Sequence, residues 1–114
     1  IPWGVVTNKP AWLTAPLMTA LGLASRAAVC VSADEAAAAK PAPDALLLAC
    51  ERATLNPEHC YYIGDDLRDI VAGQAAGMVT VAVRWGYVGT GDPIEAWGAD
   101  HIVDTVVDLA ALIA

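Results

Sequence analysis

Three carboxylates within five positions form the densest group of reactive side chains in the sequence. Asp65 and Asp66 directly follow an apolar, strand-like segment, and Asp69 falls in the first turn of the helix expected next. Clustered carboxylates repel one another unless a cation joins them. Mg²⁺ prefers one or two carboxylates together with waters and substrate phosphate. We therefore expect these three residues to supply magnesium ligands, although Asp66 could instead cap the helix and Asp69 could simply favour its N-terminus.

Three further polar side chains suit the binding of a phosphoryl group. Thr7 and Asn8 offer a hydroxyl and an amide at the end of a β-branched run, and Lys40 is a lone cation before two prolines. A lysine close to bound phosphate would neutralise charge on its oxygens. Taken singly, Thr7 could be an ordinary strand residue, Asn8 a turn former and Lys40 a solvated surface group. The order of the groups along the chain favours a functional role for Thr7 and Lys40 and leaves Asn8 open.

The segments that must position these groups alternate between strand and helix patterns. We expect strands at residues 4–8, 28–31, 60–63, 80–83 and 101–103. We expect helices at residues 13–21, 43–53, 67–76, 94–97 and 106–114. Pro16 should delay the start of the first helix or kink it. This alternation predicts an α/β fold, with a Rossmann-like parallel sheet covered by helices on both faces and a site at the carboxyl ends of the strands.

Composition narrows the function classes. The formal net charge of −7 disfavours binding to nucleic acid or to an anionic membrane. No apolar run approaches the roughly 20 residues that span a bilayer, and no signal-like segment precedes the first strand. Cys30, Cys50 and Cys60 form an odd set without C-x-x-C spacing, which indicates buried free thiols in a reducing, cytoplasmic protein.

The order of the polar groups resembles three motifs of the haloacid dehalogenase (HAD) superfamily of phosphatases. Residues 5–9 resemble its second motif, residues 40–43 its third and residues 64–69 its fourth. Residues 73–78 and 84–87 also look like the phosphoglycolate phosphatase branch, with a narrower similarity to N-acetylmuramic acid 6-phosphate phosphatases. The resemblance covers nearly the whole chain, and its weight comes from three motifs in the right order.

The resemblance implies a Mg²⁺-dependent phosphomonoester hydrolase that acts through an aspartyl-phosphate intermediate. Its substrate would be a small phosphorylated metabolite, such as phosphoglycolate or a sugar phosphate. Thr7, Lys40 and Asp65 would be catalytic residues, and Thr7, Asn8 and Lys40 would bind the substrate phosphate.

One motif of the family is missing from this sequence. No Asp-x-Asp occurs anywhere in the chain, and the first Asp of that motif is the family's nucleophile. We therefore expect residues 1–114 to be the C-terminal part of a HAD-like core domain without its cap, and to be inactive alone. In the family fold the missing strand is central. Without it, residues 5–7 and 61–63 would expose pairing edges or close against each other, and exposed edges would promote self-association.

Other functions fit the sequence less well. A non-catalytic fragment or pseudoenzyme has the same motifs and is the main alternative. A receiver-like phosphoacceptor domain would carry its acidic pair before the Thr and Lys, whereas here the order is Thr7, Lys40, Asp65. A dinucleotide-binding domain would need a G-x-G-x-x-G turn after its first strand, and the glycines at residues 86–91 follow a late strand without that spacing.

Overall fold

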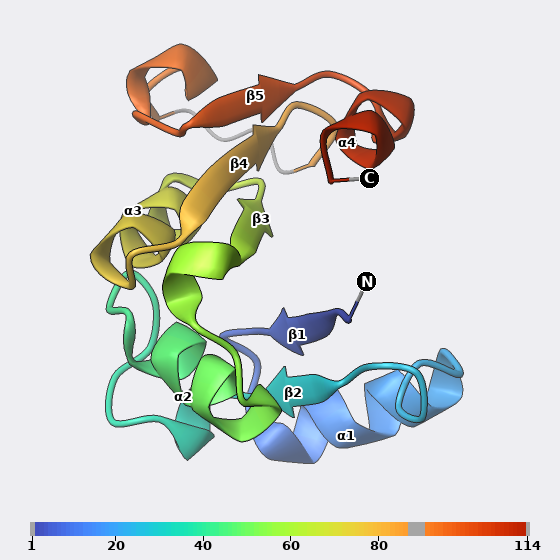
Figure 1. Ribbon diagram of the computed structural model, residues 1–114. Coiled ribbons are helices and arrows are strands. Elements are labelled where there is room, and N and C mark those ends of the chain that lie inside the picture. Colours follow the sequence, from blue (N-terminus) through green and yellow to red (C-terminus); the bar gives the residue numbers. More distant parts are fainter. Residues whose placement is uncertain (1, 87–90, 114) are drawn as a thin grey trace.

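The computed structural model describes residues 2–86 and 91–113, which alternate between strands and helices as expected (Figure 1). The strands are β1 (Gly4–Val6), β2 (Val29–Val31), β3 (Tyr61–Gly64), β4 (Val79–Val83) and β5 (His101–Val103). The α-helices are α1 (Ala11–Ala20), α2 (Asp44–Ala53), α3 (Leu67–Ala75) and α4 (Val106–Ile113). Short 3₁₀ turns occupy Ala33–Glu35, Pro57–His59 and Ile94–Ala96.

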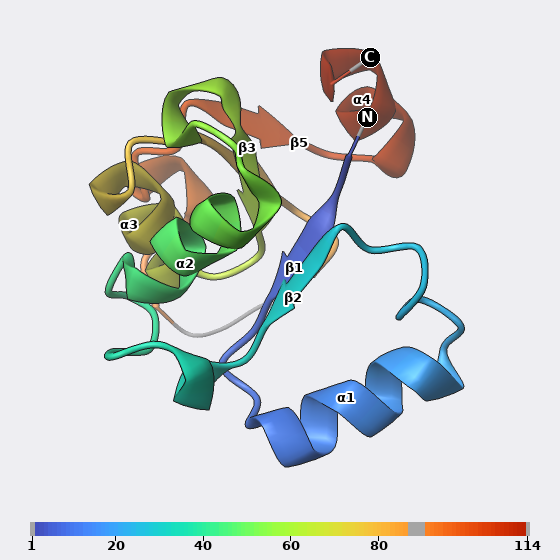
Figure 2. The same cartoon turned by 60° about the horizontal axis from the view of Figure 1, so that its bottom comes forward.

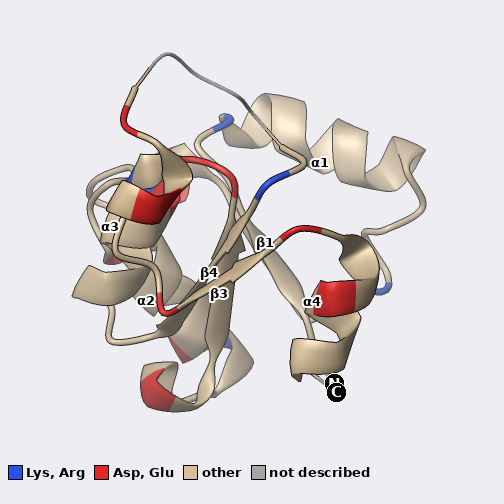
Figure 3. Ribbon diagram, turned by 90° about the horizontal axis from the view of Figure 1, so that it is seen from above, with Lys and Arg blue, Asp and Glu red and all other residues tan. Residues whose placement is uncertain are grey.

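The strands of the described residues form two parallel sheets. β1 pairs with β2, placing Val5 opposite Cys30, and a second sheet has the order β3-β4-β5. Figure 2 shows α1 and α2 on opposite sides of the β1–β2 pair, and Figures 1 and 3 show α3 and α4 on opposite sides of the second sheet. The predicted α/β fold, a parallel sheet with helices on both faces that lacks its central strand, is confirmed.

A groove separates the two sheets because β1 and β3 do not pair. Its volume is about 630 Å³, and both strands line it. Its walls include Val5 and Val6 from β1 and Tyr61 and Ile63 from β3, so the lining is mostly apolar. Of the two outcomes expected for these strands, unpaired facing edges are observed and closure is not. We call this space the β1–β3 groove. Self-association through its edges stays a prediction.

Helices α2 and α3 pack against each other and thereby connect the two sheets. Leu46 of α2 is fully buried in a cluster with Ala72 of α3 and Ala76, the residue that caps the end of α3. Val6 of β1 and Tyr62 of β3 pack against the same cluster. This cluster therefore joins residues from both sheets.

Pro16 is accommodated within α1, contrary to the expectation of a delayed start. The helix begins at Ala11, and the hydroxyl of Thr14 donates to the carbonyl of Pro10 at 3.0 Å. Gly22 and Gly77 have positive φ angles of 72° and 80°, as expected for residues that end helices. In residues 2–86 and 91–113, no helix is both long enough and apolar enough to cross a membrane.

The buried junction at Leu46 makes a testable prediction about stability. Leu46→Ala should lower the free energy of unfolding by about 3 kcal/mol, because it opens a cavity where α2 and α3 meet. Leu47→Ala is a matched control, since Leu47 is the next residue of the same helix and is 42 % exposed. It should change stability by no more than about 0.5 kcal/mol. Urea denaturation followed by circular dichroism measures both, and equal losses would contradict this packing.

Candidate functional site

The ammonium group of Lys40 is the centre of the candidate site. Its Nζ donates hydrogen bonds to Asp69 Oδ1 at 2.7 Å, to the Tyr62 hydroxyl at 3.0 Å and to the Val6 carbonyl at 3.4 Å. The Lys40 and Asp69 side chains are each only 9 % exposed. One cation therefore connects the carboxyl end of β1 with β3 and the first turn of α3. Lys40 thus lies directly beside Asp69 of the acidic group.

The backbone of Lys40 is held by Asn8. The Asn8 side-chain oxygen accepts from the Lys40 amide at 3.1 Å, and its side-chain nitrogen donates to the Lys40 carbonyl at 3.3 Å. The Lys40–Pro41 peptide is cis. The sequence offered Asn8 as a phosphate ligand or a turn former. Its side chain instead fixes the loop that carries the lysine, and a phosphate contact from Asn8 stays a prediction.

Asp69 positions two other site residues. While Oδ1 accepts from Lys40, Oδ2 accepts from the backbone amide of Asp65 at 3.2 Å. The backbone of Gly64 passes so close that a Cβ there would overlap the Asp69 side chain. Glycine is therefore required at the end of β3 for this carboxylate to reach both partners.

Asp66 and Asp65 lie where β3 passes into α3. Asp66 is the N-cap of the helix, with Oδ1 accepting from the Arg68 amide at 3.0 Å, so the capping alternative is confirmed. Its side chain remains 25 % exposed. Asp65 is packed by the loop after β4, because a Cβ on Gly86 would overlap its side chain.

The three carboxylates do not converge on a single point. Among residues 2–86 and 91–113, no group of three Asp, Glu, His or Cys side chains is arranged to hold a metal ion. Both oxygens of Asp69 already accept hydrogen bonds within the protein. Metal binding by Asp65, Asp66 or Asp69 stays a prediction.

Thr7 continues directly from the β1 residue that binds Lys40. Its amide donates to the Val31 carbonyl at 3.0 Å, which extends the β1–β2 pairing. Its hydroxyl oxygen accepts from the Lys9 amide at 3.2 Å. A hydroxyl that accepts from a backbone N–H still has its own proton to donate. The Thr7 hydroxyl therefore keeps a proton to donate, and its contact with a phosphoryl group stays a prediction.

Tyr62 is a site residue that the sequence did not single out. Its hydroxyl accepts from Lys40 and donates to the Val6 carbonyl at 3.5 Å, and its ring centroid lies 5.7 Å from the lysine nitrogen. Alternation along β3 separates the half-buried Tyr62 from the exposed Tyr61, which is the signal that could have found it. In the 84–87 segment that resembles the phosphoglycolate phosphatase branch, Trp85 is 45 % exposed, and Tyr87 lies outside the described residues.

Burial and charge act in opposite directions on the pKa of Lys40 and on that of Tyr62. Burial favours the neutral amine of Lys40, but its hydrogen bond to Asp69 and its contacts with Tyr62 outweigh that effect and raise the lysine pKa. Burial also raises the pKa of Tyr62, which the Lys40 charge only partly offsets. Figure 3 shows acidic segments on several sides of the molecule and few basic ones, so this cation is held in an acidic protein. Lys40 therefore stays charged through the neutral range.

Comparison with known proteins agrees with this geometry. The family model for haloacid dehalogenase-like hydrolases matches residues 1–83, so the chain belongs to that family. It is 46 % identical over 111 residues to the N-acetylmuramic acid 6-phosphate phosphatase of Pseudomonas putida, covering 97 % of this chain and 50 % of that protein. It is 38 % identical over 109 residues to the phosphoglycolate phosphatase of Escherichia coli K12, covering 96 % and 43 %. The chain spans about half the length of the curated relatives it matches.

Solved structures show the same fold. A predicted phosphoglycolate phosphatase from Haemophilus somnus superposes with a TM-score of 0.88 at 28 % identity, covering 99 % of this chain and 50 % of that one. A HAD family hydrolase from Deinococcus radiodurans, solved with bound phosphate and sodium, gives 0.83 at 23 % identity, covering 100 % and 52 %. The expected HAD-type α/β fold is thus confirmed, and the homologues are HAD phosphatases.

The buried ion pair predicts a strong effect of removing one partner. Asp69→Ala should lower the free energy of unfolding by about 3 kcal/mol, because it leaves the Lys40 charge buried without its carboxylate. Glu95→Ala is the control, since it removes an ion pair with Arg84 at the exposed surface and should have little effect. Chemical denaturation at pH 7 compares the two. Equal, small losses would contradict the burial of the pair.

The raised pKa of Lys40 predicts a loss of stability at alkaline pH. A folded-state pKa above the ordinary value of 10.5 contributes stability that is complete below pH 10.5 and is lost as the pH rises through the folded value. The raised pKa of Tyr62 acts in the same direction. Unfolding free energies measured from pH 8 to 11.5 should therefore fall less steeply in Lys40→Met than in the unaltered chain. Lys9→Met, which removes an exposed lysine, should keep the steep fall.

Proposed function

We propose that this chain is the phosphate- and metal-binding part of a Mg²⁺-dependent phosphomonoester hydrolase. The observation that carries the proposal is the buried Lys40 ammonium, fixed by Asp69, Tyr62 and Val6 at the junction of β1 and β3. A permanently charged, preorganised donor at that position suits the charge that develops on phosphoryl oxygens. Thr7, the residue after Val6, supplies a hydroxyl donor on the same edge.

Each residue would have a distinct part in the reaction. Lys40 would hold the phosphoryl group through charge and hydrogen bonding, and Thr7 would orient it with its hydroxyl. Asp69 and Asn8 would keep the lysine in place from its side chain and its backbone, respectively. Because these groups are fixed before substrate binds, little reorganisation is needed when charge develops.

We propose Asp65, with Asp66 beside it, as the protein's oxygen ligands for Mg²⁺. Two carboxylates at one strand end fit an ion that completes its shell with waters and phosphate oxygens. Bound there, Mg²⁺ would neutralise phosphate charge and help align the phosphoryl group for attack. Asp69 fits a positioning role better, since Lys40 and the Asp65 amide engage its two oxygens.

The nucleophile would come from a strand seated in the β1–β3 groove. The groove is lined by both unpaired edges, and Lys40 bridges Val6 and Tyr62, which also line it. A strand between β1 and β3 would join the two sheets and bring its carboxyl end to Lys40. An aspartate there could attack phosphorus and form the aspartyl-phosphate intermediate. Residues 1–114 alone lack the family's Asp-x-Asp motif, so they would be inactive.

The substrate would be a small phosphorylated metabolite. We favour N-acetylmuramic acid 6-phosphate over phosphoglycolate, because relatives with the first name reach 46 % and 50 % identity and the Escherichia coli phosphoglycolate phosphatase reaches 38 %. Proteins named phosphoglycolate phosphatase from Xanthomonas campestris reach 46 %, so the two substrates need to be compared directly.

The test is a phosphatase assay with Mg²⁺ on two proteins: the full-length protein that contains this chain, and residues 1–114 alone. The full-length protein should hydrolyse N-acetylmuramic acid 6-phosphate with a higher kcat/KM than phosphoglycolate, and residues 1–114 should hydrolyse neither. Lys40→Met in the full-length protein should lower kcat about 100-fold or more.

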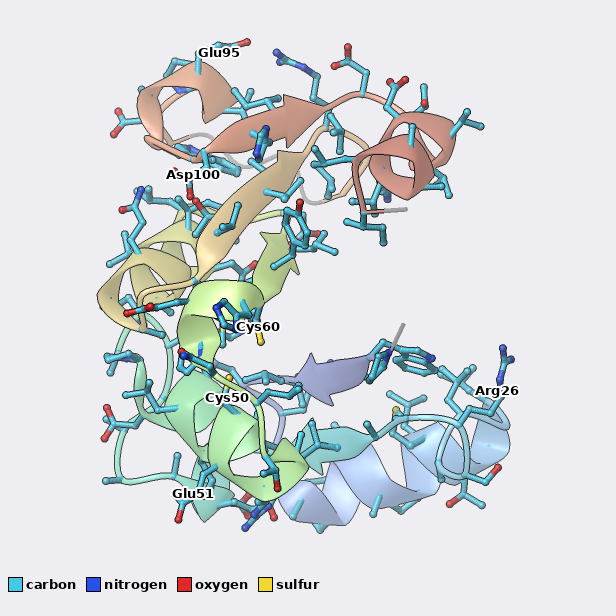
Figure 4. All side chains as sticks on the ribbon, in the orientation of Figure 1. Arg26, Cys50, Glu51, Cys60, Glu95 and Asp100 are labelled. Atoms are coloured by element: carbon cyan, nitrogen blue, oxygen red, sulfur yellow. The ribbon has the colours of Figure 1, made fainter. Side chains whose placement is uncertain are left out.

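Arg26→Met is the matched control, because Arg26 is an exposed cation beyond the end of α1, away from the site (Figure 4). It should leave kcat unchanged. Turnover by residues 1–114 alone would contradict the proposed external nucleophile. Full activity of the Lys40→Met protein would contradict the proposed role of the lysine.

A further inference from the structure

Two of the three cysteines lie together on the wall of the β1–β3 groove. Cys50 is in the last turn of α2, and Cys60 lies between the Pro57–His59 turn and β3. Both line the groove, and Figure 4 shows their side chains extending toward each other from neighbouring segments. The sequence pattern predicted buried, independent thiols. Cys50 is buried, whereas Cys60 is only partly so, and the fold brings the two together.

The connection between the two cysteines is tightly held. Thr54 takes a left-handed conformation with φ 58°, and the Leu55 amide donates to the Cys50 carbonyl at 2.8 Å. The Cys60 thiol lies 3.3 Å from the Asn56 carbonyl, to which it donates. The Cys60 amide donates to the Pro57 carbonyl at 3.0 Å. These bonds fix both ends of the short link between the two cysteines.

The two thiols influence each other directly. Burial raises the pKa of Cys50 to about 11, and the neighbouring Cys60 adds to the shift through its charge and a hydrogen bond to its side chain. Cys50 is therefore a protonated thiol in hydrogen-bonding reach of Cys60. Cys30 differs, since it lies in β2 and its pKa is raised by burial and then by Glu35, not by another cysteine.

We propose that Cys50 and Cys60 are a redox pair that a peroxide converts into an intramolecular disulfide. The Cys60 thiolate, on the more exposed residue, would attack one oxygen of hydrogen peroxide. The O–O bond breaks, hydroxide leaves and takes up a proton as water, and Cys60 becomes a sulfenic acid. The Cys50 sulfur then attacks the Cys60 sulfur, the S–O bond breaks, and a second water leaves. Two thiols lose two electrons in total, and the peroxide is reduced to two waters.

The disulfide would alter one wall of the groove. It would join the C-terminal turn of α2 covalently to the residue before β3, at the edge where the two sheets face each other. Oxidation would therefore stiffen the boundary of the space between β1 and β3. This inference depends only on the placement of the thiols, and it stands apart from the proposed phosphatase activity.

Peptide mapping of the oxidised chain tests the proposal. The reduced chain is treated with hydrogen peroxide, blocked with N-ethylmaleimide and cleaved after glutamate. Because the glutamates are at positions 35, 51, 58 and 95, the three cysteines fall on separate peptides, residues 1–35, 36–51 and 59–95. We expect peptides 36–51 and 59–95 to be joined by a disulfide, and the free thiols of the unfolded, unblocked chain to fall from three to one.

Two variants and a tenfold dilution distinguish an intramolecular disulfide between Cys50 and Cys60 from other products. Cys30→Ser should form the same cross-link, whereas Cys60→Ser should leave Cys50 available for alkylation after unfolding. A tenfold dilution should not change the yield, since both thiols belong to one chain. The proposal is overturned if Cys50 and Cys60 are both recovered alkylated, if Cys60 accumulates as a sulfinic acid without a cross-link, or if the cross-link joins only separate chains.

Discussion

The ammonium of Lys40 is the interaction on which the candidate site depends. It binds the last residue of β1, the hydroxyl of a β3 tyrosine and the carboxylate of Asp69 in α3. These partners come from both sheets, which have no backbone pairing with each other in the described residues. A buried cation needs compensating acceptors, since desolvation alone would make its charge costly. The need to satisfy one positive charge thus brings the functional ends of the two sheets together.

The apolar cluster around Leu46 supports the arrangement of the site. Leu46 contacts α3 and is joined by Val6 and Tyr62, the same two residues that accept from Lys40. Val6 and Tyr62 therefore take part both in the hydrogen bonds to Lys40 and in the apolar cluster around Leu46. A shift in α2 would move the lysine's acceptors. The β1–β3 groove lies beside this junction, with mostly apolar walls and two strand edges that pair with no other strand in the described residues. Unpaired edges and apolar walls both favour a strand as its occupant.

Membership of the HAD-like hydrolases gives this arrangement its chemical meaning. In the proposed function, the lysine, the threonine and the carboxylates at the strand ends would hold a phosphoryl group, and their hydrogen bonds fix them in advance. The attacking group would come from outside residues 1–114, which contain no Asp-x-Asp. The phosphate-binding groups and the nucleophile can come from different segments of the protein. Stabilising the phosphate charge requires several fixed donors, whereas attack requires only one nucleophile placed next to them. The thiol pair lies on the wall of the same groove, outside the phosphate-binding cluster.

The sequence by itself determined the order of the elements and the identity of most site residues. Alternating β-branched runs and helical periodicity are local signals, so β1 to β5 and the main helices lie close to their expected positions. Thr7 and Asp65 became candidates because they follow strand-like segments, whose carboxyl ends meet at one edge of a parallel sheet, and Lys40 because of its place in the order of the motifs. Only the tertiary structure decided which partners these residues take. The clamp of Asn8 on Lys40, the two hydrogen bonds of Asp69, the inclusion of Tyr62 and the meeting of Cys50 with Cys60 all depend on contacts between segments that local patterns do not encode. The split into two sheets was decided in the same way, because strand pairing is set by which edges meet in space.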